Sequence, residues 1–254
     1  MDENGSKLVP NQFSQLSLGI VCPMANEAAT AVPFVEAVMA QCRKPGFKSV
    51  NFFVILDGKS KDGTRELLEN LREQQSSLKI IWTPQNSGVV QAYLRGYREA
   101  LDSGADWILE IDGGFSHQPS EIPQFFEKMA YGYDCVFGSR FCDGGGMRDS
   151  SFNRYVISRG GTILSNLLLG TSLKDMTSGF ELFTRHTLQY VLDKGIKSRS
   201  PFFQTEIKAY CHHLNAVEVP IHYRAASHEI EVAALRDSFA HLWRLFRLRL
   251  QNKL

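Results

Sequence analysis

Apolar stretches rich in β-branched and aromatic residues recur along the N-terminal half of the chain, and polar stretches with helical periodicity separate them. The apolar runs cover 16–22, 50–56, 78–82, 107–111 and 135–139. Continuous apolar runs are typical of parallel strands buried on both faces. Strands that alternate with helices predict a mainly parallel sheet with helices on each side. The pattern therefore favours an α/β fold of three layers.

Helix signals fill the segments between these runs. Asp62 is placed to cap a helix that begins at Thr64, and a helical pattern runs from Val89 to about Ser103. A helix near Pro119 is a further expectation. Toward the C-terminus we expect a mobile loop over 140–150, a helix over 152–169, a helix from Thr205, a strand over 217–223 and a final helix.

The chain of 254 residues is long enough for one large domain with a sizeable core. We expect a polar N-terminal arm over 1–15, a single α/β domain over 16–228 and an amphipathic helix over 229–254. A net charge of +1 gives no overall case for binding nucleic acid. No apolar stretch is typical of a signal peptide or a membrane span, and five scattered cysteines without a Cys-x-x-Cys pair argue against a disulfide framework or a zinc site. These features favour a cytoplasmic protein.

The last segment combines an apolar stripe with basic residues. Its apolar positions are Val232, Leu235, Phe239, Leu242, Trp243, Phe246 and Leu250. From Leu235 onward, five Lys or Arg against one Asp give a local charge of +4. A helix of this kind is typical of a peripheral contact with an anionic membrane, here the inner face of the cytoplasmic membrane. Docking on the protein body or in a homodimer explains the same pattern equally well.

Polar and glycine residues follow the apolar runs, where ligands bind in open parallel sheets. Asp57 and Asp112 each end a strand. Gly88, Gly113 and Gly114 let the backbone approach a phosphate group. Each feature has a structural alternative, because a strand-end Asp can cap the next helix and a glycine can serve helix packing. The recurrence of such loops at one edge favours a ligand site.

In their order, these segments resemble nucleotide-sugar-dependent glycosyltransferases of family 2, with the GT-A (Rossmann-like) fold, in the dolichol-phosphate mannose synthase-like branch. The matching motifs are Pro23-x-x-Asn26-Glu27, Asp57 with Ser60 and Asp62-Gly63-Thr64, Asn86-x-Gly88-x-x-x-Ala92-x-x-x-Gly96, Asp112 with Ser116-His117-x-Pro119, Gly138-Ser139-Arg140, Gly144-Gly145, Arg154 and Arg159, Asp175-x-Thr177-Ser178-Gly179-Phe180, Phe203-Gln204-x-Glu206 and Glu218-Val219-Pro220-Ile221. Together they cover about residues 16–224.

Four positions depart from the family pattern. Gly58 and Gly114 stand where the family has acids, and Gly114 replaces the second acid of the metal-binding Asp-x-Asp motif. Glu181 stands where an Arg is usual, and 224–230 lack the branch's Arg-x-x-Gly-x-Ser-Lys ending. Relatives in this branch often carry transmembrane helices, which this sequence does not contain.

The resemblance implies a donor site, a metal site and an acceptor site. The nucleotide-sugar site would comprise Pro23, Asn26, Glu27, Asp57, Asn86, Gly88, Asp112, Gly113 and Gly114. Asp112, with His117 or water, would hold Mg²⁺ or Mn²⁺ on the donor diphosphate, since hard cations prefer oxygen ligands and keep several waters. Arg140 could also neutralise the leaving diphosphate directly. GDP-mannose is the first candidate donor, and UDP-sugars use the same fold.

The acceptor decides which further groups the chemistry needs. A polyprenyl phosphate is already ionised, so positioning by Arg140, Arg154 and Arg159 suffices. A glycan hydroxyl needs a general base, for which Asp175 and Glu206 are the candidates, although Asp175 can equally serve a turn.

Two functions follow. One is an inverting glycosyltransferase that moves a hexose of mannose or glucose type to polyprenyl phosphate or a glycan, in cell-envelope glycan biosynthesis. The alternative is a non-catalytic relative that binds a nucleotide or a partner protein, which the missing acids at Gly58 and Gly114 motivate. The polar groups retained at one edge favour the enzyme.

Overall fold

A computed structural model describes residues 13–85, 88–149, 151–224 and 232–254. Its strands are β1 (Ser17–Met24), β2 (Ser49–Asp57), β3 (Leu78–Thr83), β4 (Trp107–Glu110), β5 (Cys135–Ser139), β6 (Gly146–Arg148), β7 (Glu181–Thr184), β8 (Ala216–Pro220) and β9 (His222–Arg224). Its α-helices are α1 (Ala31–Arg43), α2 (Thr64–Gln74), α3 (Val89–Asp102), α4 (Ile122–Ala130), α5 (Phe152–Leu169), α6 (Arg185–Lys194), α7 (Phe203–Tyr210) and α8 (Val232–Leu250), and a 3-10 turn, η1, spans Pro119–Glu121.

Seven strands form the central sheet in the order β3-β2-β1-β4-β7-β5-β8. The pairs β3–β2, β2–β1, β1–β4 and β5–β8 are parallel, and β7 runs antiparallel to both β4 and β5. A small second sheet pairs β6 with β9 in parallel. The predicted α/β class and the mainly parallel sheet are confirmed. Strand β7, a short strand that begins with a glutamate, was not predicted from the sequence.

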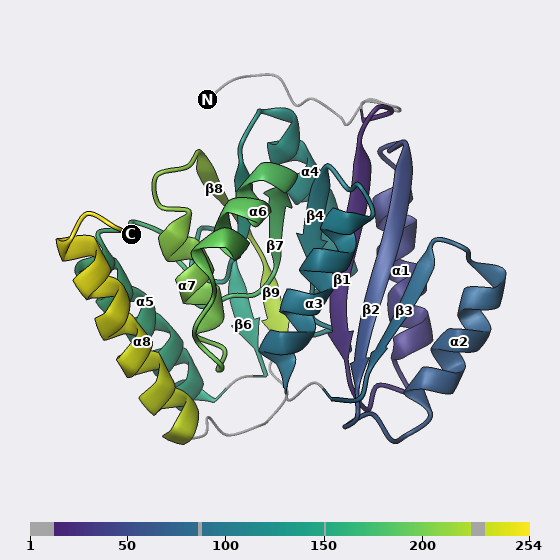
Figure 1. Cartoon of the computed structure of the whole chain (residues 1–254), viewed down its shortest axis with the longest axis horizontal. Helices are drawn as coiled ribbons and strands as arrows, with labels where there is room; N and C mark the ends of the chain where they lie inside the picture. The colour runs from purple at the N-terminus through teal and green to yellow at the C-terminus, as the bar shows by residue number, and fades with distance from the viewer. Residues whose placement is uncertain (1–12, 86–87, 150, 225–231) are drawn as a thin grey trace.

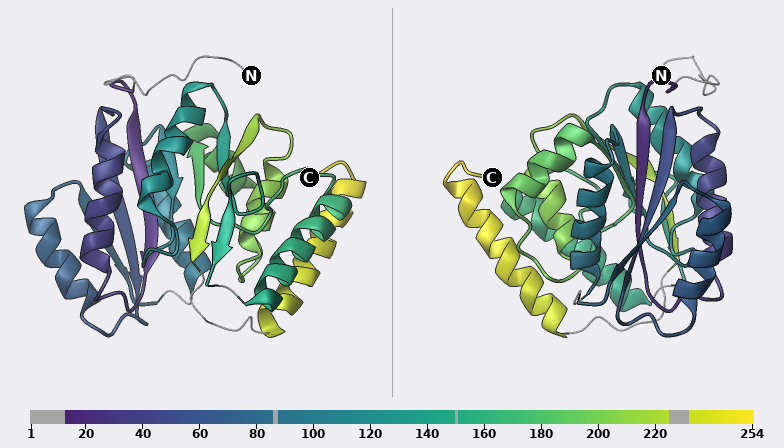
Figure 2. Two further views of the ribbon diagram at one scale, coloured as in Figure 1. Left: turned by 180° about the vertical axis from the view of Figure 1, so that it is seen from behind. Right: turned by 45° about the vertical axis from the view of Figure 1, so that its right-hand side comes forward.

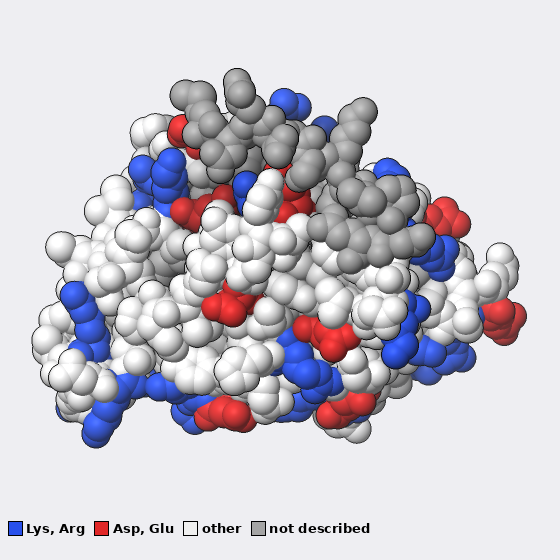
Figure 3. Space-filling model, turned by 90° about the horizontal axis from the view of Figure 1, so that it is seen from above, with Lys and Arg blue, Asp and Glu red and all other residues white. Residues whose placement is uncertain are grey.

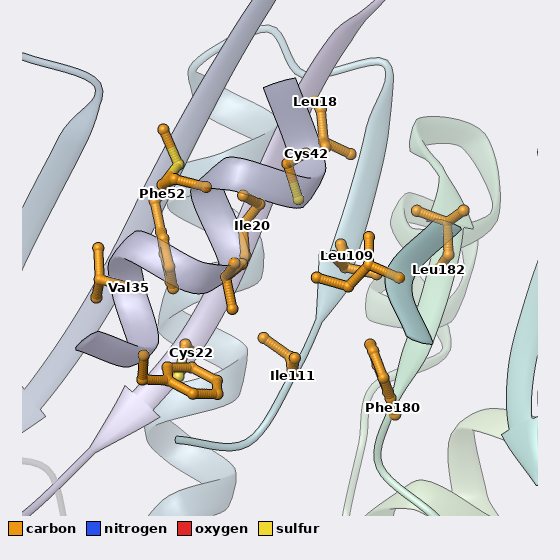
Figure 4. Close-up of a cluster of buried hydrophobic side chains, with 14 of the residues drawn as sticks. Leu18, Ile20, Cys22, Val35, Cys42, Phe52, Leu109, Ile111, Phe180 and Leu182 are labelled. Atoms are coloured by element: carbon orange, nitrogen blue, oxygen red, sulfur yellow. The ribbon is translucent and has the colours of Figure 1, made fainter. Parts of the chain in front are cut away.

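Helices cover both faces of the sheet (Figures 1 and 2). One apolar core unites α1, α2 and α4 with one face of the sheet, and Figure 4 shows part of it around Cys22, Phe52 and Leu109. The second core joins α3, α6, α7 and α8 to the other face. Gly96 lets α3 pack closely, because a Cβ there would lie 2.3 Å from Val21 and 2.6 Å from Ile55. The three expected layers are present.

Three segments differ from the sequence expectations. Strand β1 continues through Pro23, although proline lacks an N–H to donate. The pairing of β1 with β4 ends at Val21, so Pro23 has a strand neighbour only on the β2 side. The expected strand over 217–223 is divided into β8 and β9, and the expected loop over 140–150 contains β6.

The ends of the chain also refine the expected domains. Phe13 belongs to the expected polar arm, yet it is buried and stacks on Phe47 with ring centroids 5.1 Å apart. Most of the arm, residues 1–12, and the boundary expected at 228 lie outside the described residues. The five cysteines are free thiols. On the face seen in Figure 3, Lys and Arg side chains alternate with Asp and Glu.

Helix α8 packs against α5 at one edge of the molecule (Figures 1 and 2). Leu242 and Leu245 of α8 are buried in the second core, and Arg249 donates to the carbonyl groups of Leu167 and Leu168 at the end of α5. Helix α8 therefore docks on the protein body, which is one of the alternatives that the sequence offered. Across the described residues, no helix combines the length and apolar character that crossing a membrane requires.

Candidate active site

The loops after β1 and β2 are joined by hydrogen bonds. The Asn26 carboxamide oxygen accepts from the Lys61 N–H at 3.0 Å, and the Thr64 hydroxyl accepts from the Glu27 N–H at 2.8 Å. Asp62 accepts from the Ala28 N–H at 2.9 Å and from the Thr64 N–H at 3.1 Å. Asp62 thus has the structural role expected for it. The two loops form one unit at the carboxyl edge of the sheet.

Asp57 lies beside this unit at the end of β2. It is buried, and its side chain accepts from the Lys59 N–H at 2.9 Å. Gly88 stands immediately before α3 with a φ of 113°, a conformation that side chains disfavour. Asn86, the other residue expected in this loop, lies outside the described residues. Pro23 and Asp57 thus lie at the carboxyl ends of β1 and β2, and Glu27 and Gly88 lie in the loops that follow β1 and β3. These three strands are adjacent in the sheet.

Asp112 follows β4 at the same edge. Its Oδ1 accepts a hydrogen bond from the Tyr93 hydroxyl of α3, and its own N–H donates to Nδ1 of His117 at 3.4 Å. The side chain keeps 36% of its surface exposed. Asp112 is therefore an accessible carboxylate held by groups from two directions, and carboxylate oxygens are ligands that a hard cation prefers.

His117 lies behind Asp112. It is almost completely buried, with its ring stacked on Phe180 at 5.0 Å and packed on Tyr223 at 5.2 Å between ring centroids. Burial lowers the pKa of His117 to about 4, so the ring is neutral at neutral pH. Nδ1 accepts from the Asp112 backbone, and buried Nε2 has no partner among the described residues. This arrangement supports Asp112 and presents neither nitrogen to solvent, which disfavours His117 as a metal ligand.

Gly113, directly after Asp112, packs against the end of β1, and Gly114 lies against the carboxylate of Glu27. A Cβ at Gly113 would lie 3.1 Å from Met24 and 3.6 Å from the Cys22 sulfur. Burial, and then the charges of Asp112 and Glu27, raise the pKa of the Cys22 thiol. Both carboxylates are thus close enough to the Cys22 thiol for their charges to act on it.

Asp175 and Arg140 form a buried ion pair. Arg140 Nε lies 2.7 Å from Asp175 Oδ2, Nη2 lies 2.8 Å from Oδ1, and the Arg140 N–H donates to Oδ2 at 3.0 Å. Burial alone would raise the pKa of Asp175, but the Arg140 charge and its hydrogen bonds hold that pKa well below the usual range. Asp175 stays ionised and accepts no proton near neutral pH. The structure thus disfavours Asp175 as a general base and gives it the role of orienting Arg140.

Two further arginines, Arg154 and Arg159, lie near Arg140 of this pair, as the sequence led us to expect. The Arg140 and Arg159 guanidinium groups each lie 5.2 Å from the Phe141 ring centroid, and Arg154 lies 5.6 Å from that of Tyr223. Arg159 also donates to the Lys174 carbonyl at 3.0 Å. Arg140 and Arg159 line a cavity of about 560 Å³ whose wall includes aromatic residues of α5. Cationic groups with aromatic neighbours suit a phosphate group attached to an apolar body.

The family model of Glycosyl transferase family 2 matches residues 19–192. The chain belongs to this family. Among curated members, the undecaprenyl-phosphate mannosyltransferase of Micrococcus luteus is 31% identical over 66% of this chain and 70% of the relative. The polyprenol monophosphomannose synthase of Mycolicibacterium smegmatis is 28% identical over 80% of this chain and 75% of the relative. The predicted family is confirmed, and the relatives belong to the predicted branch.

Solved structures support the GT-A fold of this family 2 member. The glucosyl-3-phosphoglycerate synthase of Mycobacterium tuberculosis, determined with Mn²⁺, UDP and glucosyl-3-phosphoglycerate, has a TM-score of 0.64 at 16% identity, covering 97% of this chain and 86% of that chain. The Staphylococcus aureus protein TarS, residues 1–349, in complex with UDP, has a TM-score of 0.60 at 15% identity, covering 93% and 66% respectively. At these identities the likeness concerns the fold.

Glu206 lies apart from the other expected residues of this family 2 site. Its carboxylate accepts from the Lys197 N–H at 3.1 Å, from the Ser198 N–H at 2.9 Å and from Arg244 of α8. It is fully buried. The interactions of Glu206 anchor α8 and the loop before α7, and this disfavours it as a catalytic base.

The expected metal site can be tested against these positions. In the described parts of the chain, no three His, Cys, Asp or Glu side chains gather closely enough to hold a metal ion alone. A hard cation on a diphosphate needs only one or two protein carboxylates, because phosphate oxygens and waters complete its shell. Exposed Asp112 and half-buried Glu27 supply suitable oxygen donors, so the residues fit a cation that arrives with a nucleotide.

Two tyrosines at the site were missed from the sequence. Tyr93 bonds to Asp112 from within α3, and Tyr223 lies between His117 and the Arg154 guanidinium. Both occupy apolar positions in their elements, where a buried aromatic residue is the ordinary expectation. No local pattern distinguishes them, because their partners come from distant segments.

Proposed function

We propose that this family 2 member is an inverting glycosyltransferase that moves a hexose, with mannose as the first candidate, from a nucleotide-diphosphate sugar to polyprenyl phosphate. The observation that carries this proposal is the buried pair of Asp175 and Arg140 beside an arginine-lined cavity. The two curated relatives described above, which act on polyprenyl acceptors by name, support the same choice.

The pairing of the candidate bases favours an acceptor that needs no base. Arg140 occupies both oxygens of Asp175, and Arg244 together with backbone N–H groups occupies Glu206. A sugar hydroxyl must lose a proton as it attacks, whereas a phosphate monoester is already ionised near neutral pH. Arg154 and Arg159 would then orient the attacking phosphate oxygen toward the anomeric carbon.

The donor would bind at the opposite side of the site. Pro23 and Asp57, at the carboxyl ends of β1 and β2, would hold the nucleoside, and Gly88 and Gly113 would admit the diphosphate to the backbone. Asp112 would hold Mg²⁺ or Mn²⁺ on that diphosphate, and the cation would stabilise the charge of the leaving group. GDP-mannose and UDP-linked hexoses are the donors to compare.

A lipid acceptor requires access from a membrane surface, and we propose that the outer face of α5 and α8 provides it. Phe152 and Leu167 of α5 and Phe239 and Trp243 of α8 are large apolar side chains left exposed on these two packed helices. The arginine-lined cavity opens beside the start of α5 at Phe152. A peripheral helix pair of this composition binds the interface of an anionic bilayer.

The chemistry is tested by incubating the purified protein with labelled GDP-mannose or UDP-glucose and two lipids of equal chain length, polyprenyl phosphate and the polyprenol alcohol. We expect label to reach the phosphate lipid and not the alcohol. Transfer to the alcohol would contradict the choice of acceptor. Nucleotide binding without transfer to any lipid or glycan acceptor would favour the non-catalytic alternative.

The membrane contact is tested by flotation with vesicles that contain anionic lipid. Phe239→Glu with Trp243→Glu should abolish flotation, because it places charge on the apolar face. Leu67→Glu provides a matched control, since Leu67 is an exposed apolar residue of α2, away from α5 and α8. Unchanged flotation of the α8 variant would contradict this contact.

A further inference from the structure

Gly114 occupies the place of the second acid in the family's Asp-x-Asp motif, and the structure explains why a glycine stands there. Its φ is +72°, a conformation that side chains rarely adopt. A Cβ at this position would lie 2.6 Å from Glu27 Oε2 and 2.7 Å from Oε1. A side chain at 114 would therefore meet the carboxylate of Glu27, which occupies that space and would have to move.

Glu27 is held in this position from two sides. Its N–H donates to the Thr64 hydroxyl at 2.8 Å, which fixes the backbone against the loop after β2. The Thr30 hydroxyl donates to Oε2, which fixes the direction of the side chain. The carboxylate over Gly114 is thus set by the fold of two loops.

The Asp112 carboxylate lies at the other end of the same short turn. Gly113, between the two positions, packs on Met24 and Cys22 at the end of β1, so the turn follows the edge on which Glu27 stands. The turn thus carries the Asp112 carboxylate, and the loop after β1 places the Glu27 carboxylate against the turn at Gly114. A pair of carboxylates from adjacent loops matches the oxygen donors that a divalent cation takes from protein.

We propose that Glu27 supplies the second acidic ligand of the metal site, in place of the acid missing at 114. The divalent cation, Mg²⁺ or Mn²⁺, would bind Asp112 and Glu27 together with oxygens of the donor diphosphate. This inference rests on the proposed function for the presence of a nucleotide-diphosphate donor. It assigns to Glu27 a role that differs from the nucleoside contact which the family resemblance implies.

The direct test is a titration of Mn²⁺ into the protein with UDP or GDP present, followed by the electron paramagnetic resonance signal of free Mn²⁺. Glu27→Gln keeps the shape of the side chain and removes its charge, and we expect Mn²⁺ affinity to fall at least about tenfold. Glu36→Gln is the matched control, because Glu36 is an exposed glutamate of α1 and loses the same charge. Wild-type Mn²⁺ affinity in Glu27→Gln would overturn the proposal.

A second measurement separates metal binding from contact with the nucleoside. Binding of UMP or GMP in the presence of a chelator reports the nucleoside pocket without the metal. We expect Glu27→Gln to leave this affinity unchanged. A loss of nucleoside monophosphate binding as large as the loss of Mn²⁺ binding would overturn the metal role.

A relocated carboxylate provides a rescue experiment. Glu27→Ala removes the acid and empties the space over Gly114, and Asp tolerates a positive φ better than most residues. The double variant Glu27→Ala with Gly114→Asp should therefore regain most of the Mn²⁺ affinity that Glu27→Ala loses. Thermal unfolding of each variant verifies that the folded protein is compared, and a folded double variant without recovery would contradict the proposal.

Failure of this inference and failure of the proposed function give different results. Mn²⁺ binding that depends on Glu27, without transfer to polyprenyl phosphate, would retain the metal site and reject the function. Transfer that proceeds in chelator, with no Mn²⁺ binding by the wild type, would retain the function and reject the metal site.

Discussion

In the N-terminal half of the sheet, Asp112 and Glu27 stand in loops and keep part of their surface exposed. In the C-terminal half, Asp175, Glu181 and Glu206 are fully buried, each beside an arginine or a lysine. The first half can offer negative charge to a cation, and the second uses its acids to hold cations in place. The difference separates a side suited to metal and diphosphate from a side suited to an anionic acceptor.

The largest expected effect comes from breaking a buried pair in the second half. Lys208 Nζ lies 2.5 Å from Glu181 Oε1 and 2.7 Å from the Ser178 carbonyl oxygen, with both charged side chains fully buried. Lys208→Met leaves Glu181 without its cation, so the free energy of unfolding should fall by about 3–5 kcal/mol. Urea denaturation measures the change.

The companion variant for this pair removes both charges. Glu181→Leu with Lys208→Met removes both charges of this pair, and the double variant should recover much of the stability lost by Lys208→Met. A double variant less stable than the single one would contradict a simple structural pairing.

Removing the accessible acid of the first half should act on catalysis and leave the fold intact. Asp112→Asn should lower kcat/KM by about 10²–10³-fold, because the charge that faces the diphosphate cation is lost. Initial rates with whichever of GDP-mannose and UDP-glucose supports transfer measure the effect. Asp102→Asn is the control, because Asp102 is an exposed acid at the end of α3. Equal rates for the two variants would contradict a role for Asp112 in the active site.

His117 connects the two halves and gives a pH dependence. Burial lowers its pKa to about 4, whereas an unfolded histidine titrates at about 6.5. As the pH falls, the unfolded state binds a proton on His117 before the folded state does. The neutral, buried His117 therefore contributes its full stability above about pH 6.5. This contribution falls as the pH drops toward about 4, and the total loss is up to about 3 kcal/mol.

Comparison with His117→Phe isolates this contribution from other titrating groups. The aromatic ring can keep its stacking on Phe180, and the titration is absent. Urea denaturation across the pH window should show a smaller loss of stability in the variant. The same pH dependence in both proteins would contradict a buried neutral histidine.

A smaller effect is expected from one cation of the acceptor side. Arg159→Gln should raise KM for polyprenyl phosphate about tenfold, because one charge-assisted contact to the phosphate is lost, while KM for the donor stays unchanged. Arg159→Lys retains the charge and should lie between. Equal changes in both KM values would remove the distinction between the two sides.

The local sequence pattern predicted helices and strands well where the spacing of the apolar residues matches the side of the element that the fold buries. The apolar run 135–139 coincides with β5, and the helical pattern 152–169 coincides with α5. The missed strand β7 has four residues and begins with buried Glu181. A glutamate in a central strand is stable here because Lys208 approaches it from α7, a partner that no local pattern reveals.

The site was predictable in position and less so in role. Asp112 and Asp57 follow buried strands, which the rule on strand ends anticipates. The role of Asp175 could not be predicted, because it depends on Arg140, which lies 35 residues away in the sequence. Tyr93 and Tyr223 were missed for the same reason. Residue type and order indicate which groups a site contains, while their protonation and pairing require the fold.

The hydrogen bonds between the loops after β1 and β2 bear on the thermodynamics of donor binding. Asn26, Glu27 and Ala28 are fastened to the neighbouring loop within the protein itself. Fixing the backbone of a loop residue costs about 1–2 kcal/mol of conformational entropy. In this protein the entropy is lost when the chain folds and not when the donor binds. Donor binding should consequently carry a small entropic penalty and proceed without a slow loop-ordering step.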